Sequence, residues 1–110
     1  MKLPGAERAV VDPAKVRDYL LSSAHAIGRF KARFFLGLGY SPENWQALVR
    51  DLERHAEEGS ATRGERSAYG QKFQVRGRLV GPNGRDAEII TIWIVLTGED
   101  VPRFVTAFPG

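Results

Sequence analysis

A chain of 110 residues, of which 43% are hydrophobic and 26% charged, has the size and composition of one globular domain spanning 1–110. It contains no cysteine and 2 histidines, which excludes a disulfide scaffold and thiolate metal sites, so we predict no metal and no cofactor. A net charge of +3 is modest, and its distribution along the chain is more informative than its size.

No segment approaches the roughly 18 uninterrupted apolar residues that a membrane span requires. The first dozen residues carry charges at Lys2, Glu7, Arg8 and Asp12 and have no apolar run of signal-peptide length. We therefore expect no membrane interaction and, by default, a cytoplasmic location.

Three helices are predicted in the first half of the chain. Asp12-Pro13 places a capping carboxylate before a proline and predicts a helix at about 13–22. A second helix is expected at about 28–37. Ser41-Pro42 repeats the start signal, and apolar residues at helical spacing extend the third helix over about 42–57.

The second half is predicted to form an antiparallel sheet. The polar segment 59–65 is expected to be a loop, and from Tyr69 onward the apolar period changes to two. Strands are expected at about 69–80, 86–97 and 103–108. The predicted fold class is α+β, with the N-terminal helices packed on one face of this C-terminal sheet.

Asn83-Gly84 is a strong signal for a two-residue hairpin turn between the first two predicted strands. That turn sets Val75 opposite Ile92 and Phe73 opposite Ile94 on one apolar face. The other face then combines a row of polar and basic side chains with a hydroxyl and an indole. Its predicted members are Lys72, Gln74, Arg76, Arg78, Thr91 and Trp93.

Cations beside an aromatic ring are typical of surfaces that grip phosphates and stack bases. An arginine stacked on Trp93 in a purely structural cation–π pair is an equally good interpretation. The face of Thr106 also stays open. A four-residue turn at 98–101 places Thr106 on the basic face, whereas a five-residue turn places it in the core.

Two long windows lack acidic residues. One lies between Tyr19 and Pro42 and contains Arg29, Lys31 and Arg33, and the other runs from Arg66 to Arg85. If they fold together, they form a basic surface that attracts polyanions, nucleic acid first. Basic residues that merely keep a solvated face soluble are the alternative.

Several segments resemble a bacterial family of domains of unknown function, which occurs as stand-alone proteins and as C-terminal modules of polymorphic toxins. Its layout is similar to that of the metal-independent ribonucleases that unite the barnase, EndoU, colicin and RelE types. The resemblance implies helices followed by a four-stranded antiparallel sheet. The matching segments are Tyr19-Leu20-Leu21, 25–40, 69–75, Gly81-Pro82-Asn83-Gly84, 91–94 and 102–109.

The resemblance implies RNA cleavage by transesterification without a metal. Histidine suits the proton transfers, because its pKa lies near neutrality, and His25 precedes a predicted helix N-terminus by a few residues. A histidine that hydrogen-bonds a loop is the alternative for His25, and His55 is interpreted as partly buried packing. The predicted catalytic residues are His25, Lys31, Arg76, Thr91 and Thr106. The predicted nucleic-acid contacts are Lys72, Gln74, Arg78, Trp93 and Arg103.

The expected partners are RNA, tRNA included, and an acidic immunity or antitoxin protein that covers the basic face. Fusion to a larger toxin would deliver such a module into a target cell. The family commonly ends in Thr-Ala-Tyr-Pro, whereas this chain has Phe108 in place of the tyrosine. A degenerate relative is therefore included in the hypothesis. The main alternative is a non-catalytic module that binds nucleic acid or an acidic protein through the same face.

Overall fold

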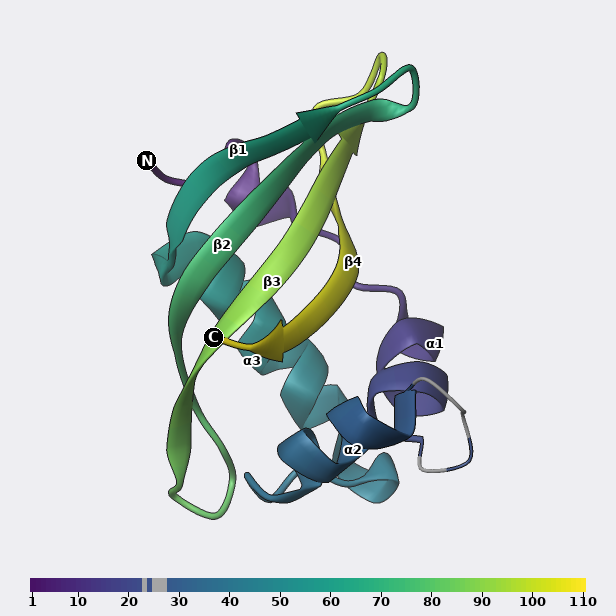
Figure 1. Ribbon diagram of the computed structural model, residues 1–110, viewed down its shortest axis with the longest axis vertical. Coiled ribbons are helices and arrows are strands. Elements are labelled where there is room, and N and C mark those ends of the chain that lie inside the picture. Colours follow the sequence, from purple (N-terminus) through teal and green to yellow (C-terminus); the bar gives the residue numbers. More distant parts are fainter. Residues whose placement is uncertain (23, 25–27) are drawn as a thin grey trace.

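The computed structural model describes residues 1–22, 24 and 28–110. Helices from the first half of the chain pack against one face of a four-stranded antiparallel sheet, with strand order β1-β2-β3-β4. In Figure 1, α3 crosses behind the sheet and α2 lies below the end of β4. The helical elements are η1 (Ala6–Arg8), α1 (Pro13–Lys15), η2 (Val16–Leu20), α2 (Gly28–Leu36), η3 (Pro42–Asn44) and α3 (Trp45–Glu58). The strands are β1 (Ser60–Arg66), β2 (Gly70–Val80), β3 (Asp86–Leu96) and β4 (Pro102–Pro109).

The helix starts lie where the capping signals predict them. The Asp12 carboxylate accepts a hydrogen bond from the Ala14 N–H at 2.9 Å, and α1 continues into η2 as one helical segment. Ser41 and Asn44 form a reciprocal capping box before α3, in which the Ser41 N–H donates to Asn44 Oδ1 at 2.6 Å. Both caps satisfy main-chain groups that a helix terminus leaves unpaired, so the predicted helices are confirmed.

The core lies between α3 and the sheet. Leu48, Leu52 and Ala56 form the apolar stripe of α3 and are completely buried. They pack with the η2 residues and with the inner face of the sheet, which is the face turned toward α3. The main sheet contributors to this core are Phe73, Val75, Leu79, Ile89, Trp93, Phe104 and Ala107.

The loop predicted for 59–65 is wrong, because Ser60–Arg66 forms β1 and pairs antiparallel with β2. Ala61 is the buried residue of this strand and lies opposite Val75. The other side chains of β1 are exposed and polar, so the segment carries no alternating apolar pattern. Main-chain pairing with β2 makes it a strand, which completes the four strands that the family resemblance implies.

The predicted register between β2 and β3 is also wrong by one residue. Phe73 lies opposite Trp93 and Val75 opposite Thr91. The connection is a wider turn, in which the Gly81 N–H donates to the Arg85 carbonyl at 2.8 Å. A one-residue change of register moves every β3 side chain to the opposite face.

The wider turn docks on the residues that follow α2. The Asn83 N–H donates to the Leu38 carbonyl at 3.3 Å, and Asn83 Nδ2 donates to the Gly37 carbonyl at 3.1 Å. A Cβ atom on Gly81 would lie 1.9 Å from the Leu38 carbonyl oxygen, so only glycine fits this approach. These contacts between distant segments select the turn in place of the two-residue hairpin.

A bulge in β4 decides the face of Thr106. Phe104 lies opposite Trp93, whereas Thr106 lies opposite Ile92, so Val105 is an additional residue between the two pairs. Phe104 therefore points into the core and Thr106 points to the other side of the sheet. The length of the turn at 98–101 therefore does not by itself decide on which face Thr106 lies.

Candidate functional site

The sheet face turned away from α3, called the outer face below, carries the basic row predicted from β2. Residues of one parity share a face along a strand, and the inner-face residues of β2 are Phe73, Val75 and Leu79. The predicted basic and polar side chains of β2 and β4 therefore lie together on the outer face. Its members include Lys72, Gln74, Arg76, Arg78, Ile92, Ile94, Arg103, Thr106 and Phe108.

Three arginines of the outer face are held in ion pairs. Arg76 pairs with Glu88 and Arg78 pairs with Asp86, in both cases across the β2–β3 ladder. Arg103 Nε lies 3.1 Å from Glu99 Oε1. Each pair is solvent-exposed and contributes about 0–1 kcal/mol, but it lowers the positive potential of the face. The acid-free window of β2 did not reveal this, because the acids come from neighbouring strands and turns.

Lys31 of α2 meets Thr106 of β4 at the margin of the outer face. Lys31 Nζ donates a hydrogen bond to Thr106 Oγ1 at 2.6 Å and lies 5.3 Å from the centre of the Tyr19 ring. Both side chains of the hydrogen bond are half-buried. Two predicted site residues that are 75 positions apart are therefore in direct contact.

Thr91 and Trp93 do not belong to this face. Both are 0% exposed and lie on the inner face. Trp93 Nε1 donates to Thr91 Oγ1 at 2.7 Å, and the indole packs edge-on against Phe104. The predicted outward position of both residues is wrong, because the register differs by one. In this structure neither side chain is available to stack on a base or to donate to a phosphate.

His55 lies next to Thr91 and extends the buried polar group that Thr91 forms with Trp93. Its Nδ1 is 3.1 Å from Thr91 Oγ1, and 4% of the residue is exposed, so its interpretation as packing agrees with its burial. Burial lowers the pKa of His55, and the carbonyls of Gly77 and Ile89 oppose this shift. Nε2 is buried and has no hydrogen-bond partner within the described part of the chain.

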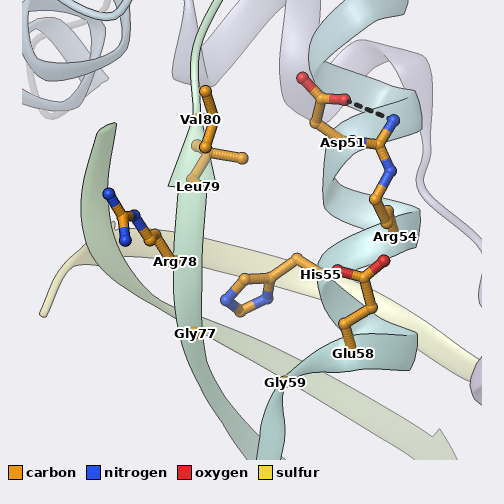
Figure 2. Close-up of a pocket in the computed structure, with 9 residues that line it drawn as sticks. All are labelled: Asp51, Arg54, His55, Glu58, Gly59, Gly77, Arg78, Leu79 and Val80. Carbon is orange, nitrogen blue, oxygen red and sulfur yellow. Dashed lines mark ion pairs between the residues drawn. The ribbon is translucent and has the colours of Figure 1, made fainter. Parts of the chain in front are cut away.

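Figure 2 shows His55 between α3 and β2, in the wall of a cavity of about 260 Å³. Sequence reasoning did not find this cavity. The only signal is the polar spacing along α3, which sets Asp51, Arg54, His55 and Glu58 on one side of the helix.

Tyr40 and Asp51 form a second, partly buried polar contact that the sequence did not reveal. Tyr40 Oη donates to Asp51 Oδ2 at 2.5 Å, and Asp51 Oδ1 lies 3.3 Å from Arg54 Nη2. Burial, together with the Asp51 carboxylate, raises the pKa of Tyr40 far above its ordinary value. The phenol therefore remains a hydrogen-bond donor throughout the physiological pH range.

His25 lies outside the described residues, so the structure does not place the predicted acid–base group. Phe108 lies opposite Ile90 on the outer face. In residues 1–22, 24 and 28–110, no cluster of histidine, aspartate and glutamate is arranged to hold a metal ion. Within the same ranges, no helix has both the length and the apolarity needed to cross a membrane.

Fold and site together define a small α+β domain whose helices cover one face of an antiparallel four-stranded meander, with cations and hydroxyls on the other face. The chain belongs to the family described as a domain of unknown function, DUF6883, whose model matches residues 2–110.

The fold is similar to that of a chain in a contact-dependent growth inhibition toxin–immunity protein complex from Klebsiella pneumoniae 342. The TM-score is 0.73 and the sequence identity 22%, over 93% of this chain and 100% of that chain. At this identity the similarity establishes the fold alone. No curated protein matches the chain.

Proposed function

We propose that this domain is a toxin-like, metal-independent ribonuclease, or a catalytically degenerate relative of one, that holds RNA on the outer face. The observation that carries the proposal is the contact of Lys31 with Thr106. It sets an ammonium group and a hydroxyl side by side at the margin of a sheet face that also carries Lys72 and Gln74.

This pair suits a phosphate that is being cleaved. In transesterification the ribose 2′-oxygen attacks phosphorus while the bond from phosphorus to the 5′-oxygen breaks, and charge builds on the non-bridging oxygens. Lys31 supplies a positive charge for these oxygens. Because Thr106 accepts the hydrogen bond from Lys31, its own hydroxyl proton remains available for a phosphate oxygen.

The proton transfers are assigned to His25 from its residue type and from its position six residues before Lys31. Arg76 contacts the phosphate chain by exchanging Glu88 for phosphate, which costs little because the ion pair is exposed. Lys72, Gln74, Arg78 and Arg103 extend the contact surface along the two strands.

The proposed partner is an acidic immunity or antitoxin protein that covers the outer face. The half-buried Ile92 and Ile94 beside cations give this face the mixed character of a protein interface. The toxin–immunity complex that contains the similar chain supports a protein partner of this kind. By the same argument, fusion to a larger toxin would deliver the domain into a target cell.

The test is incubation of the purified chain with labelled tRNA and messenger RNA in the presence of EDTA. We expect fragments that end in 2′,3′-cyclic phosphate, and we expect Lys31→Met to lower the cleavage rate by about 100-fold or more. Arg33→Met is the matched control, since Arg33 is exposed on the same helix and lies about half a turn further round. Thr106→Val and His25→Ala complete the set. Equal rates in Lys31→Met and Arg33→Met would refute the role of the contact.

A non-catalytic module is the second candidate, and the ion pairs favour it. Arg76, Arg78 and Arg103 already have carboxylate partners, and Phe108 lacks the hydroxyl that the family commonly carries. RNA binding by the wild-type chain without any cleavage would select this candidate.

A further inference from the structure

The outer edge of β2 is only partly covered by β1. The ladder between them begins at the pair Ser60–Arg76, so β2 continues past the start of β1 for residues 77–80. The cavity beside His55 lies along this uncovered segment, with α3 as its opposite wall (Figure 2). Its lining residues are Asp51, Arg54, His55, Glu58, Gly59, Gly77, Arg78, Leu79 and Val80.

The main chain of Arg78 points into this groove. In an antiparallel sheet, the N–H and C=O of one residue point to the same neighbouring strand, and the direction alternates along the chain. Glu88, opposite Arg78, accepts from the Gly110 N–H through its carbonyl at 2.8 Å and so points away from β2. Arg78 therefore points away from β3. Tyr40 Oη lies 3.4 Å from the carbonyl of Val80, which shows the same direction two residues further on.

No hydrogen bond to the Arg78 main chain is formed within 1–22, 24 and 28–110. An unpaired strand edge of this kind is a template for another strand. The end of the groove is closed by Gly59 and His55 packed against β2. A Cβ atom on Gly77 would lie 3.1 Å from His55 Nε2 and 3.4 Å from the Cα of Gly59, so glycine permits this packing.

His55 forms the floor of the groove. Its Nδ1 lies 3.1 Å from Thr91 Oγ1, and its Nε2 is buried beside Gly77 without a hydrogen-bond partner among the described residues. The ring therefore lies directly beside the strand segment that holds Arg78 and should sense a main chain that pairs there.

The α3 side of the groove supplies carboxylate groups. Asp51 is occupied by Tyr40 and Arg54, but the exposed carboxylate of Glu58 forms no ion pair with any described residue. The other charged lining residues are paired, Arg54 with Asp51 and Arg78 with Asp86, and Lys2 Nζ donates to the main-chain carbonyl of Glu58 at 2.7 Å. The groove thus combines main-chain donor and acceptor groups with the carboxylate of Glu58, which complements a peptide main chain with a basic side chain.

We propose that this groove is a docking site for an extended peptide segment of a partner protein, which adds to β2 beyond the start of β1 and places a lysine or arginine against Glu58. The segment pairs its main chain with the N–H and C=O of Arg78. The site uses the main chain of Arg78 at the edge of the sheet, whereas the outer face uses its side chain, and the two sites prefer ligands of opposite charge. The proposal therefore does not depend on the proposed ribonuclease activity.

The test starts from a random octapeptide library displayed on phage and selected on the intact chain. We expect enriched peptides to contain a basic residue, to adopt an extended conformation and to shift the NMR signals of the Arg78 amide and the His55 imidazole. In an extended peptide only every second main-chain N–H faces β2. Methylation of the nitrogens that face β2 should weaken binding by about fivefold or more, and methylation of the other set should have little effect.

Matched substitutions locate the site. Glu58→Gln should weaken binding by about two- to fivefold, whereas Glu57→Gln, at an exposed neighbouring position that does not line the groove, should leave it unchanged. Three results overturn the proposal: an absence of enriched peptides, shifts confined to outer-face residues other than Arg78, or stronger shifts of His55 with inorganic phosphate than with the selected peptides.

Discussion

The hydroxyl of Thr91 lies 3.1 Å from Nδ1 of His55, although the two residues come from a strand and a helix that are 36 positions apart. With Trp93 they form a chain of polar groups inside an otherwise apolar core. Thr91 is the centre of this chain, because its oxygen both accepts from the indole and reaches the imidazole. Thr91, which was predicted to be catalytic, is therefore part of the buried core.

Thr91→Val should lower the free energy of unfolding by about 1–3 kcal/mol, because valine keeps the shape but leaves the indole N–H and the imidazole without their shared partner. Thr62→Val is the control, since Thr62 is exposed on β1, and it should change stability by less than about 0.5 kcal/mol. Urea unfolding followed by tryptophan fluorescence measures both. Equal stabilities of the two variants would contradict a stabilising role for the hydrogen bonds among Trp93, Thr91 and His55.

His55 should make stability depend on pH near neutrality. Its pKa is lowered in the folded state from the ordinary 6.5, so below that pH the unfolded state binds more protons than the folded state. The stabilisation is fully present above pH 6.5 and is lost as the pH falls through the folded pKa. Urea midpoints between pH 7.5 and 5.5 should fall for the wild type and fall less for His55→Gln. Parallel pH profiles would show that His55 does not titrate on unfolding.

Tyr40→Phe should destabilise the chain by about 1.5–3 kcal/mol, because the Asp51 carboxylate loses the short hydrogen bond that the phenol donates. Since the folded pKa of Tyr40 lies above the ordinary 10.0, this stabilisation is present below pH 10 and is lost only at higher pH. The difference between wild type and variant should therefore be constant from pH 7 to 9. Tyr69→Phe, at a side chain that is 79% exposed, should have no measurable effect in the same unfolding assay.

Phe108→Tyr is a substitution that should increase the proposed ribonuclease activity. Phe108 stands two residues beyond Thr106 on the outer face, so a tyrosine hydroxyl at this position is added beside the proposed phosphate site. We expect the RNA cleavage rate to rise by about tenfold or more, within the range of general acid–base catalysis, with stability unchanged. Phe108→Leu, which adds no hydroxyl, should give no gain. A tyrosine variant with the rate of the wild type would remove this position from the mechanism.

Much of the fold was predictable, because the information is local. Asp12 and Ser41 cap helices through groups a few residues away, and the stripe from Leu48 to Ala56 needs only the helical period. Within β2, alternation alone places Arg76 and Arg78 on the same face. These features depend on the geometry of one element and not on its neighbours.

The sequence by itself thus determined the helices, three of the four strands and the basic row of β2. Only the tertiary structure decided the existence of β1, the inward position of Trp93 and the outward position of Thr106. The first comes from pairing with β2, the second from the docking of Asn83 on the residues that follow α2, and the third from the bulge at Val105. In a sheet, each of these choices is made by contacts between distant segments, and a shift of one residue exchanges core for surface.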